Sequence, residues 1–135
     1  MATRIPLPST MSSRRRLAVA VGGALGATAR WAVSEMAGAA GFDLLWATFV
    51  VNTMGSLMLG FVVAYHTGSS RSSPLMIPFV GVGILGAFTT FSLFSVEVLE
   101  LLREGSLGLA LVYPIGTILV GAAAAFFGVR AGAKR

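Results

Sequence analysis

Cysteine is absent from the 135-residue sequence, histidine occurs once, and only five residues are acidic. Without cysteine, no disulfide stabilises the fold. The acids and His66 occur at no spacing that would build a metal cluster or pair a nucleophile with a base, so we expect no enzyme active site. Charged residues are also scarce, at 11%, while 56% of the chain is apolar. Ordinary soluble domains do not have this composition.

The scarce charges leave long stretches without any charge. Three such runs contain 22, 23 and 25 residues, at 44–65, 74–96 and 105–129. A helix of about 20 apolar residues crosses the roughly 30 Å hydrocarbon core of a bilayer. A fourth apolar run begins at Leu17 and contains Arg30 and Glu35. The sequence therefore predicts an all-α integral membrane protein with four transmembrane helices, at about 17–37, 46–65, 75–103 and 107–129.

The same pattern divides the chain into a basic N-terminal tail at 1–16, a four-helix membrane domain at 17–130 and a C-terminal tail at 131–135. The stretch TGSSRSS reads as a polar connector between the second and third helices. One alternative stays open for the first helix. SSRRRLAVAVGGALGATAR has the basic start, the apolar stretch and the small-residue end of a cleavable export signal.

The stretch GVGILGAFTTFSLF, at 81–94, contains the G-x-G-x-x-G pattern of dinucleotide-binding loops. That pattern needs a preceding strand and a soluble βαβ unit, whereas here it follows Pro78 in an uncharged run. We therefore expect no nucleotide site and no nucleic-acid partner. Dense glycines followed by Thr89 and Thr90 instead predict a break in the third helix. Carbonyls freed at such a break must be satisfied by protein, water or a cation.

Polar residues recur at helical spacing inside the apolar runs. Thr48, Asn52 and Ser56 are four residues apart and share one helix face, as do Tyr113 and Thr117. The third helix carries Thr89, Thr90, Ser92, Ser95 and Glu97. Such residues either hydrogen-bond neighbouring helices or line a water-filled path. The sequence leaves both interpretations open.

Phe91 and Phe94 are three residues apart on one face of the third helix. Phenylalanine in a membrane helix usually contacts lipid or packs against a neighbour. The edge of its ring is electropositive, however, and favours a small anion in a dry passage. The pair is thus a second feature with a packing and a functional interpretation.

Three stretches, GGALGATARW, TFVVNTMGSLMLG and GILGAFTTFSLFSVEV, resemble in order and spacing the signature stretches of the Fluc (CrcB) fluoride channels. The resemblance covers 17–129. It implies a passive, fluoride-selective channel in the plasma membrane of a bacterium, which exports fluoride and protects the cell against its toxicity. It also implies an antiparallel dimer of four-helix subunits with two pores and a broken third helix.

The resemblance also implies roles for individual residues. Backbone carbonyls at the break hold a structural sodium ion at the dimer interface, and the matching carbonyls are those of Gly86 and Thr89. Phe91 and Phe94 match the paired rings that line each pore, and Asn52 matches the amide donor near them. Tyr113 and Thr117 match a track of hydroxyls on the fourth helix. The fluoride pathway so implied comprises Arg30, Thr48, Asn52, Phe91, Ser92, Phe94, Glu97, Tyr113 and Thr117.

Two positions depart from the family pattern. Ala87 stands where a second glycine is usual at the break, and Gly121 stands where the hydroxyl track often continues. The remaining donors still suit a small, strongly hydrated anion, which needs hydroxyls, an amide and ring edges to replace its water.

Two other functional classes fit four short membrane helices. A small proton-coupled multidrug exporter, also dimeric, would need a membrane-embedded carboxylate, and Glu35 lies too near the end of the first helix to suit that role. A non-conducting scaffold would use its polar helix faces for packing alone. Proton coupling separates the exporter from a channel, and any fluoride flux excludes the scaffold.

The distribution of Lys and Arg predicts the orientation of the chain. With four spans, both termini and the loop after the second helix lie on one side, with eight of the ten basic residues: Arg4, Arg14, Arg15, Arg16, Arg71, Arg130, Lys134 and Arg135. Only Arg30 and Arg103 are near the other side. The positive-inside bias then favours cytoplasmic termini. We expect the antiparallel partner to be either a second copy or, given this bias, a separate homologue of opposite orientation.

Overall fold

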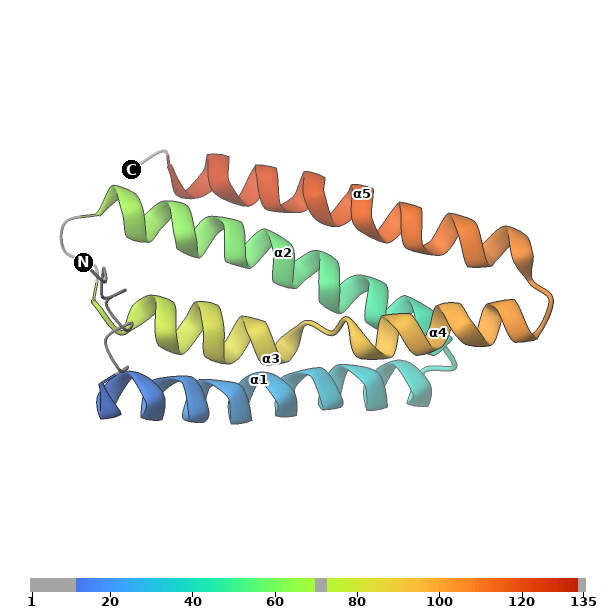
Figure 1. Cartoon of the computed structure of the whole chain (residues 1–135), viewed down its shortest axis with the longest axis horizontal. Coiled ribbons are helices and arrows are strands. Elements are labelled where there is room, and N and C mark those ends of the chain that lie inside the picture. Colours follow the sequence, from blue (N-terminus) through green and yellow to red (C-terminus); the bar gives the residue numbers. More distant parts are fainter. Residues whose placement is uncertain (1–11, 70–72, 134–135) are drawn as a thin grey trace, which may run out of the picture.

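A computed structural model describes residues 12–69 and 73–133, and all regular structure in these residues is helical (Figure 1). Five α-helices and one π-helix follow one another along the chain: α1 (Ser13–Ala39), α2 (Leu44–Gly68), the π-helix η1 (Ile77–Leu85), α3 (Gly86–Phe88), α4 (Ser92–Arg103) and α5 (Leu107–Gly132).

Four helical segments are long and apolar enough to span a membrane: Ser13–Ala39, Leu44–Gly68, Ile77–Arg103 and Leu107–Gly132. This confirms the predicted number of spans, and the chain is a multi-pass membrane protein. The observed helices extend a few residues beyond the uncharged runs. α1 begins at Ser13, inside the predicted tail, because the arginines that follow are good helix formers. α2 begins directly after Asp43, whose side chain accepts a hydrogen bond from Leu45 N at 3.1 Å.

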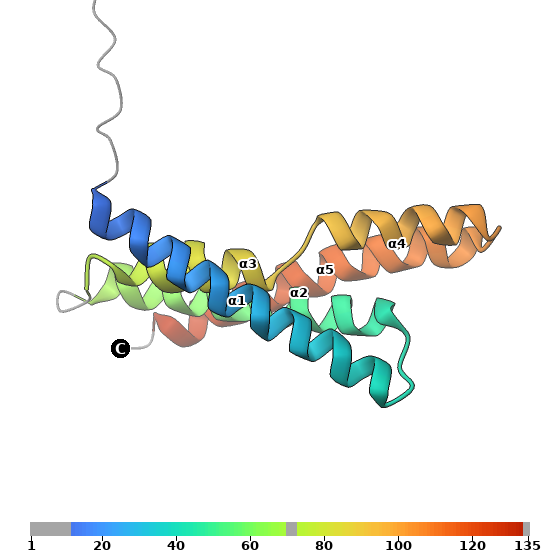
Figure 2. The ribbon, with the colours of Figure 1, turned by 90° about the horizontal axis from the view of Figure 1, so that it is seen from below.

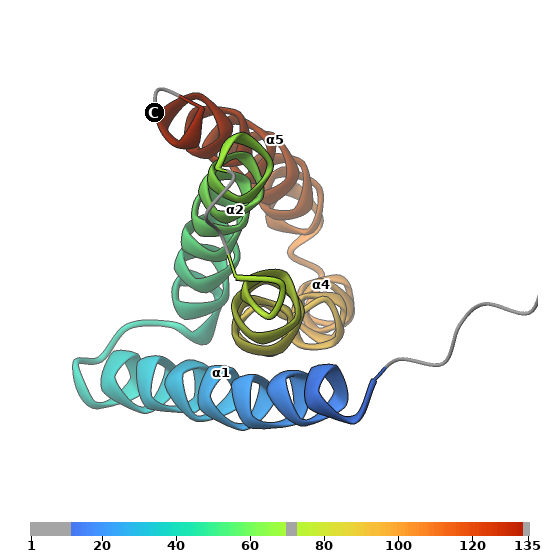
Figure 3. The same ribbon diagram turned by 90° about the vertical axis from the view of Figure 1, so that its left-hand side faces the viewer.

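Glycines set how closely the spans approach. A Cβ at Gly60 would meet Ala125 O, one at Gly128 would meet Leu57 O, and one at Gly132 would meet Phe61 O. α2 and α5 therefore pack backbone to backbone along a line that we call the α2–α5 seam, defined by Gly60, Gly128 and Gly132. From there towards the start of α5, the two helices separate (Figures 1 and 3).

α1 packs against η1 in the same manner. A Cβ at Gly22 would meet Phe79 O, and one at Gly26 would meet Ile84 O. α1 crosses the other spans at an angle (Figure 2), so this contact occupies only part of its length. The π-helical turn of η1 was not predicted, because glycine and proline content predicts a break but not its hydrogen-bond pattern.

The two ends of the bundle differ in charge. α1 begins and α5 ends at the end of the bundle on the left of Figure 1, and these helix ends carry Arg14, Arg15, Arg16 and Arg130. The opposite end carries Asp43 and Glu104 together with Arg103. The other residues of the basic count, Arg4, Arg71, Lys134 and Arg135, lie outside the described residues.

Candidate functional site

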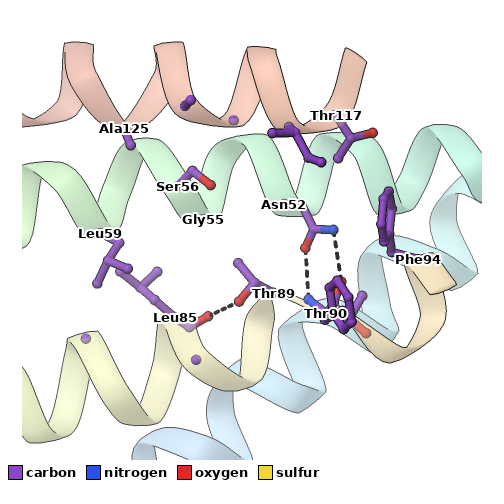
Figure 4. A pocket seen from close by; sticks show the side chains of 16 residues that line it. Asn52, Gly55, Ser56, Leu59, Leu85, Thr89, Thr90, Phe94, Thr117 and Ala125 are labelled. Atoms are coloured by element: carbon purple, nitrogen blue, oxygen red, sulfur yellow. Dashed lines mark hydrogen bonds between the residues drawn. The ribbon is translucent and has the colours of Figure 1, made fainter. Parts of the chain in front are cut away.

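A groove of about 490 Å³ runs along one side of the bundle (Figure 4). Its walls come from α2, from η1 and α3, from the start of α4 and from the middle of α5. Six residues predicted for the pathway or the sodium site line it: Asn52, Gly86, Thr89, Phe91, Phe94 and Thr117. Segments far apart in the sequence thus bring most of the predicted set to one surface.

The backbone of the third span leaves the helical conformation at the middle of this groove. α3 ends at Phe88, Thr89 is extended with φ −73° and ψ 157°, and α4 begins at Ser92. The side chain of Asn52 supports this segment at two points. Its Nδ2 donates to Thr90 O at 3.0 Å, and its Oδ1 accepts from Thr90 N at 2.8 Å (Figure 4). Asn52 therefore replaces backbone partners that a continuous helix would supply.

The same hydrogen bonds free two carbonyl oxygens. In an α-helix, Gly86 O would accept from Thr90 N, and Thr89 O would accept from Leu93 N. Thr90 N instead donates to Asn52 Oδ1, and Leu93 N donates to Thr90 Oγ1 at 3.1 Å. The two carbonyls named for sodium on the family resemblance are thus among those at the break that lack their helical donors.

Thr90 is a central residue that the sequence marked only as part of a break. It is 7% exposed, and both its backbone polar groups are bonded to Asn52. Its hydroxyl accepts from Leu93 N and lies 3.3 Å from Ser92 Oγ, so it caps the first turn of α4. An asparagine in an apolar helix was the available signal for such a partner, but the sequence did not show which residue it would meet.

Three aromatic rings follow one another from the groove towards α5. The ring centroids of Phe91 and Phe94 are 5.9 Å apart, and those of Phe94 and Tyr113 are 5.4 Å apart. Phe91 directly precedes α4 and is 79% exposed within the single chain, which is unusual for a large apolar side chain. The row of rings therefore begins at the exposed Phe91 and ends at Tyr113, which carries a hydroxyl.

That hydroxyl belongs to a buried polar cluster. Tyr113 OH donates to Glu97 Oε2 at 2.6 Å, and Thr48 Oγ1 donates to Glu97 Oε1 at 2.6 Å. Glu97 is 3% exposed and Thr48 is 2% exposed. Both carboxylate oxygens thus have a hydroxyl donor, which offsets the cost of burying the group.

Two further hydroxyls face the groove. Thr117 is 8% exposed, and its Oγ1 has no hydrogen-bond partner among the described residues. Ser56 lines the groove as well, and its Oγ lies 3.5 Å from the point where a Cβ on Gly121 would be. A hydroxyl from α2 therefore lies beside the position on α5 where the sequence lacks one.

Thr48, Ser92, Glu97 and Tyr113 do not line the groove but are linked to it through hydrogen bonds and ring contacts, whereas Arg30 has no such link to it among the described residues. Arg30 lies on α1, which packs on η1 and α3, and it is not among the residues that line the groove. Within residues 12–69 and 73–133, no group of three His, Cys, Asp or Glu side chains is arranged to hold a metal ion.

Comparison with known proteins assigns the chain to a family. The model of the family described as "CrcB-like protein, Camphor Resistance (CrcB)" matches residues 17–129. The chain belongs to the CrcB family. The match covers the second and third spans, most of the first and fourth, and every residue of the groove, so the site lies within the family region.

Curated relatives cover nearly the whole chain. A protein of Thermus thermophilus is 39% identical over 123 residues, which is 90% of this chain and 96% of the relative. One from Novosphingobium aromaticivorans is 40% identical over 82% of this chain and 90% of its own. One from Magnetococcus marinus is 41% identical over 84% and 94%, respectively. Each is named "Fluoride-specific ion channel FluC".

Proposed function

We propose that the chain is the subunit of a fluoride-selective channel that lets fluoride leave a bacterial cell passively across the plasma membrane. The observation that carries this proposal is the continuous row from the exposed ring of Phe91 through Phe94 and Tyr113 to Glu97. The names of the relatives supply the ion.

The chemistry of the groove suits fluoride. A small anion gives up its water only where replacement donors are present. Thr117 Oγ1, the second N–H of Asn52 and the hydroxyl of Ser56 are available on one wall, and Phe91 and Phe94 also line the groove. Between them the walls are apolar, which disfavours larger anions by size and lack of donors. Ser56 extends the hydroxyl track where Gly121 interrupts it.

Glu97 has a different role in this proposal. Its two oxygens accept from Thr48 and Tyr113, so the carboxylate orients both hydroxyls at the inner end of the aromatic row. Ser92, which lies beside Thr90 at the start of α4, contributes a hydroxyl near Phe91. Arg30 lies apart from the groove, and its cation attracts fluoride to the membrane face on its side.

The open side of the groove supports an antiparallel dimer. An exposed Phe91, together with apolar residues such as Ile118 and Ala122 on the same surface, would face lipid in a single subunit. A second, inverted subunit covers these residues and completes each of two pores. The basic end of the described chain favours cytoplasmic termini, so the partner is an inverted copy or a homologue with the opposite bias. Reporter fusions at the C-terminus, read on both membrane faces, distinguish the two: signal from one face alone requires a homologue.

A structural sodium ion at the dimer interface fits the freed carbonyls. Gly86 O and Thr89 O lie on the groove and have lost their helical donors, as described above. Hard oxygen ligands of this kind suit an alkali cation, and none of the five acids is needed. The ion would hold the two non-helical segments of the dimer together.

The sodium proposal is tested by thermal unfolding of the purified protein in sodium chloride and in N-methyl-D-glucamine chloride. We expect a higher midpoint in sodium, retained in Thr89→Val because the ligand is a carbonyl. Equal midpoints in the two salts contradict the sodium site without bearing on fluoride passage.

Fluoride efflux from liposomes containing the purified chain tests the channel function and its exporter rival together. A channel releases fluoride down its gradient at a rate that a protonophore and an imposed pH gradient leave unchanged. Flux that requires a proton gradient indicates an exporter, and absence of flux from dimeric protein contradicts the proposal.

A further inference from the structure

A second cavity of about 380 Å³ lies at the end of the bundle where α2 begins and α4 ends. It opens where α2 and α5 separate beyond the α2–α5 seam, and Leu101 of α4 closes one side. Aliphatic side chains such as Leu109 and Val112 form most of its wall. The groove and this cavity share no lining residue, and Tyr113, the last ring of the aromatic row, lines this cavity.

One charged group lines this cavity, and it is the carboxylate of Asp43. Its Oδ1 accepts from Leu45 N at 3.1 Å, and Asp43 forms no ion pair within the described part of the chain. Arg103, the cation at this end of α4, is not among the lining residues. A negative charge thus lies at the rim of an apolar space with no protein cation to match it.

Two aromatic rings line the same cavity as this carboxylate. Trp46 and Phe49, on the first turns of α2, both line the cavity, and their centroids are 6.0 Å apart at an interplanar angle of 80°. A quaternary or tertiary ammonium is attracted both to aromatic rings and to a carboxylate, because the ring quadrupole and the anion both favour a weakly hydrated cation. An anion is disfavoured by the same groups, and the apolar walls suit a hydrocarbon or aromatic body.

We propose that this cavity binds a hydrophobic organic cation, with its ammonium group against Asp43, Trp46 and Phe49 and its apolar body between α2 and α5. The cavity has no lining residue in common with the groove, and the proposal does not depend on the proposed channel function. Charge complementarity selects the ligand class: a carboxylate and ring faces at the mouth, and aliphatic walls inside.

The probe is benzyltrimethylammonium, titrated into the purified full-length protein in a non-ionic detergent. Trp31→Phe serves as the background, because Trp31 lies on α1 outside the cavity and its removal leaves Trp46 as the only fluorophore of its type. We expect a saturable change in Trp46 fluorescence. Phenylmethanesulfonate, which has the same apolar body and the opposite charge, should give no saturable change.

Two variants test the two halves of the site. Asp43→Asn removes the charge but keeps a good N-cap for α2, and should weaken binding about tenfold. Glu104→Gln removes a carboxylate at the same end of the bundle but outside the cavity, and should bind as the parent does. Gly116→Leu fills the cavity from α5, where a Cβ meets nothing within 4 Å, and should abolish binding while Asp43 stays in place.

Circular dichroism and gel filtration of each variant establish that it is folded. No saturable change in the parent contradicts the proposal. Equal affinity in Asp43→Asn and Glu104→Gln, or saturable binding of phenylmethanesulfonate, also overturns the proposal, because the cavity then binds apolar molecules without selecting for charge. Undiminished binding in Gly116→Leu overturns it as well, because the probe then binds elsewhere.

Discussion

α2 has two halves that meet the rest of the bundle in opposite ways. Its C-terminal half packs on α5 along the α2–α5 seam, where glycines let backbone touch backbone and no polar side chain is required. Its N-terminal half carries Thr48 and Asn52, which reach across to the third span through hydrogen bonds. Close backbone packing therefore stabilises one half of the α2–α5 pair. In the other half, which contains the groove, hydrogen bonds connect α2 to the third span.

Stability and function therefore depend on different halves of α2. Substitutions in the seam should damage folding first. Substitutions in the groove should damage passage first, with smaller losses of stability that follow the number of hydrogen bonds removed. The variants below test this division, from the largest expected effect to the smallest.

Gly128→Leu should give the largest effect, because a Cβ at this position meets Leu57 O and lies 2.9 Å from Phe61 N. Backbone atoms cannot move aside as a flexible side chain would, so we expect little folded protein after purification. Gly108→Leu on the same helix is the control, since its Cβ meets nothing within 4 Å. Gel filtration measures both. Monodisperse Gly128→Leu in parent-like yield would contradict the role of the seam.

Phe91→Ile should abolish fluoride efflux and leave the fold intact. The ring is 79% exposed in the single chain, so its removal leaves no cavity in the core. Its loss breaks the aromatic row, and efflux from liposomes should fall to the level of protein-free vesicles. Phe94→Ile should have the same effect on efflux with a larger loss of stability, because Phe94 also packs on Tyr113. Parent-like efflux in both variants would remove the row from the pathway.

Asn52→Leu should reduce both stability and efflux. The substitution removes two hydrogen bonds and leaves Thr90 N and Thr90 O without these partners, at a cost of about 2–4 kcal/mol of unfolding free energy. Chemical unfolding of purified protein measures this. A loss below about 0.5 kcal/mol would mean that Asn52 does not support the 89–91 segment.

Thr48→Val should have a smaller effect on stability than Asn52→Leu. Valine has nearly the shape of threonine but cannot donate to Glu97 Oε1, so one buried oxygen loses its partner, at a cost of about 1–3 kcal/mol. Thr48→Ser keeps the hydroxyl and serves as the control, with efflux close to that of the parent. If the two variants conduct equally, the hydrogen bond to Glu97 does not contribute to passage.

The sequence predicted the spans because uncharged runs of membrane length have few other structures available to them. It placed Thr48, Asn52 and Ser56 on one face by their spacing. It could not predict that Asn52 would bond both polar groups of Thr90, because that pairing depends on how two distant helices align along their axes. Nor could it predict the burial of Glu97, whose two donors come from different spans.

The end of each helix was predicted less well for a related reason. Local caps such as Asp43 and the helix-forming arginines after Ser13 extend helices into polar sequence, whereas hydropathy marks only the apolar part. Spacing alone left two roles open for the polar residues, packing between helices or ion passage. The family resemblance assigned residues of the groove to ion passage. The structure adds the reason why Gly86 and Thr89 carbonyls are available, which is the redirection of their helical donors.

The central claim is that fluoride passes along the groove, and two glycines of α5 test it most directly. Gly121 lines the groove, where a Cβ would meet only Ser56 Oγ, at 3.5 Å, whereas a Cβ at Gly108 meets nothing and lies outside the groove. The measurement is fluoride efflux from liposomes containing equal amounts of Gly121→Leu or Gly108→Leu. We predict that Gly121→Leu blocks efflux and Gly108→Leu conducts as the parent does. Equal, parent-like efflux from both would contradict passage along the groove.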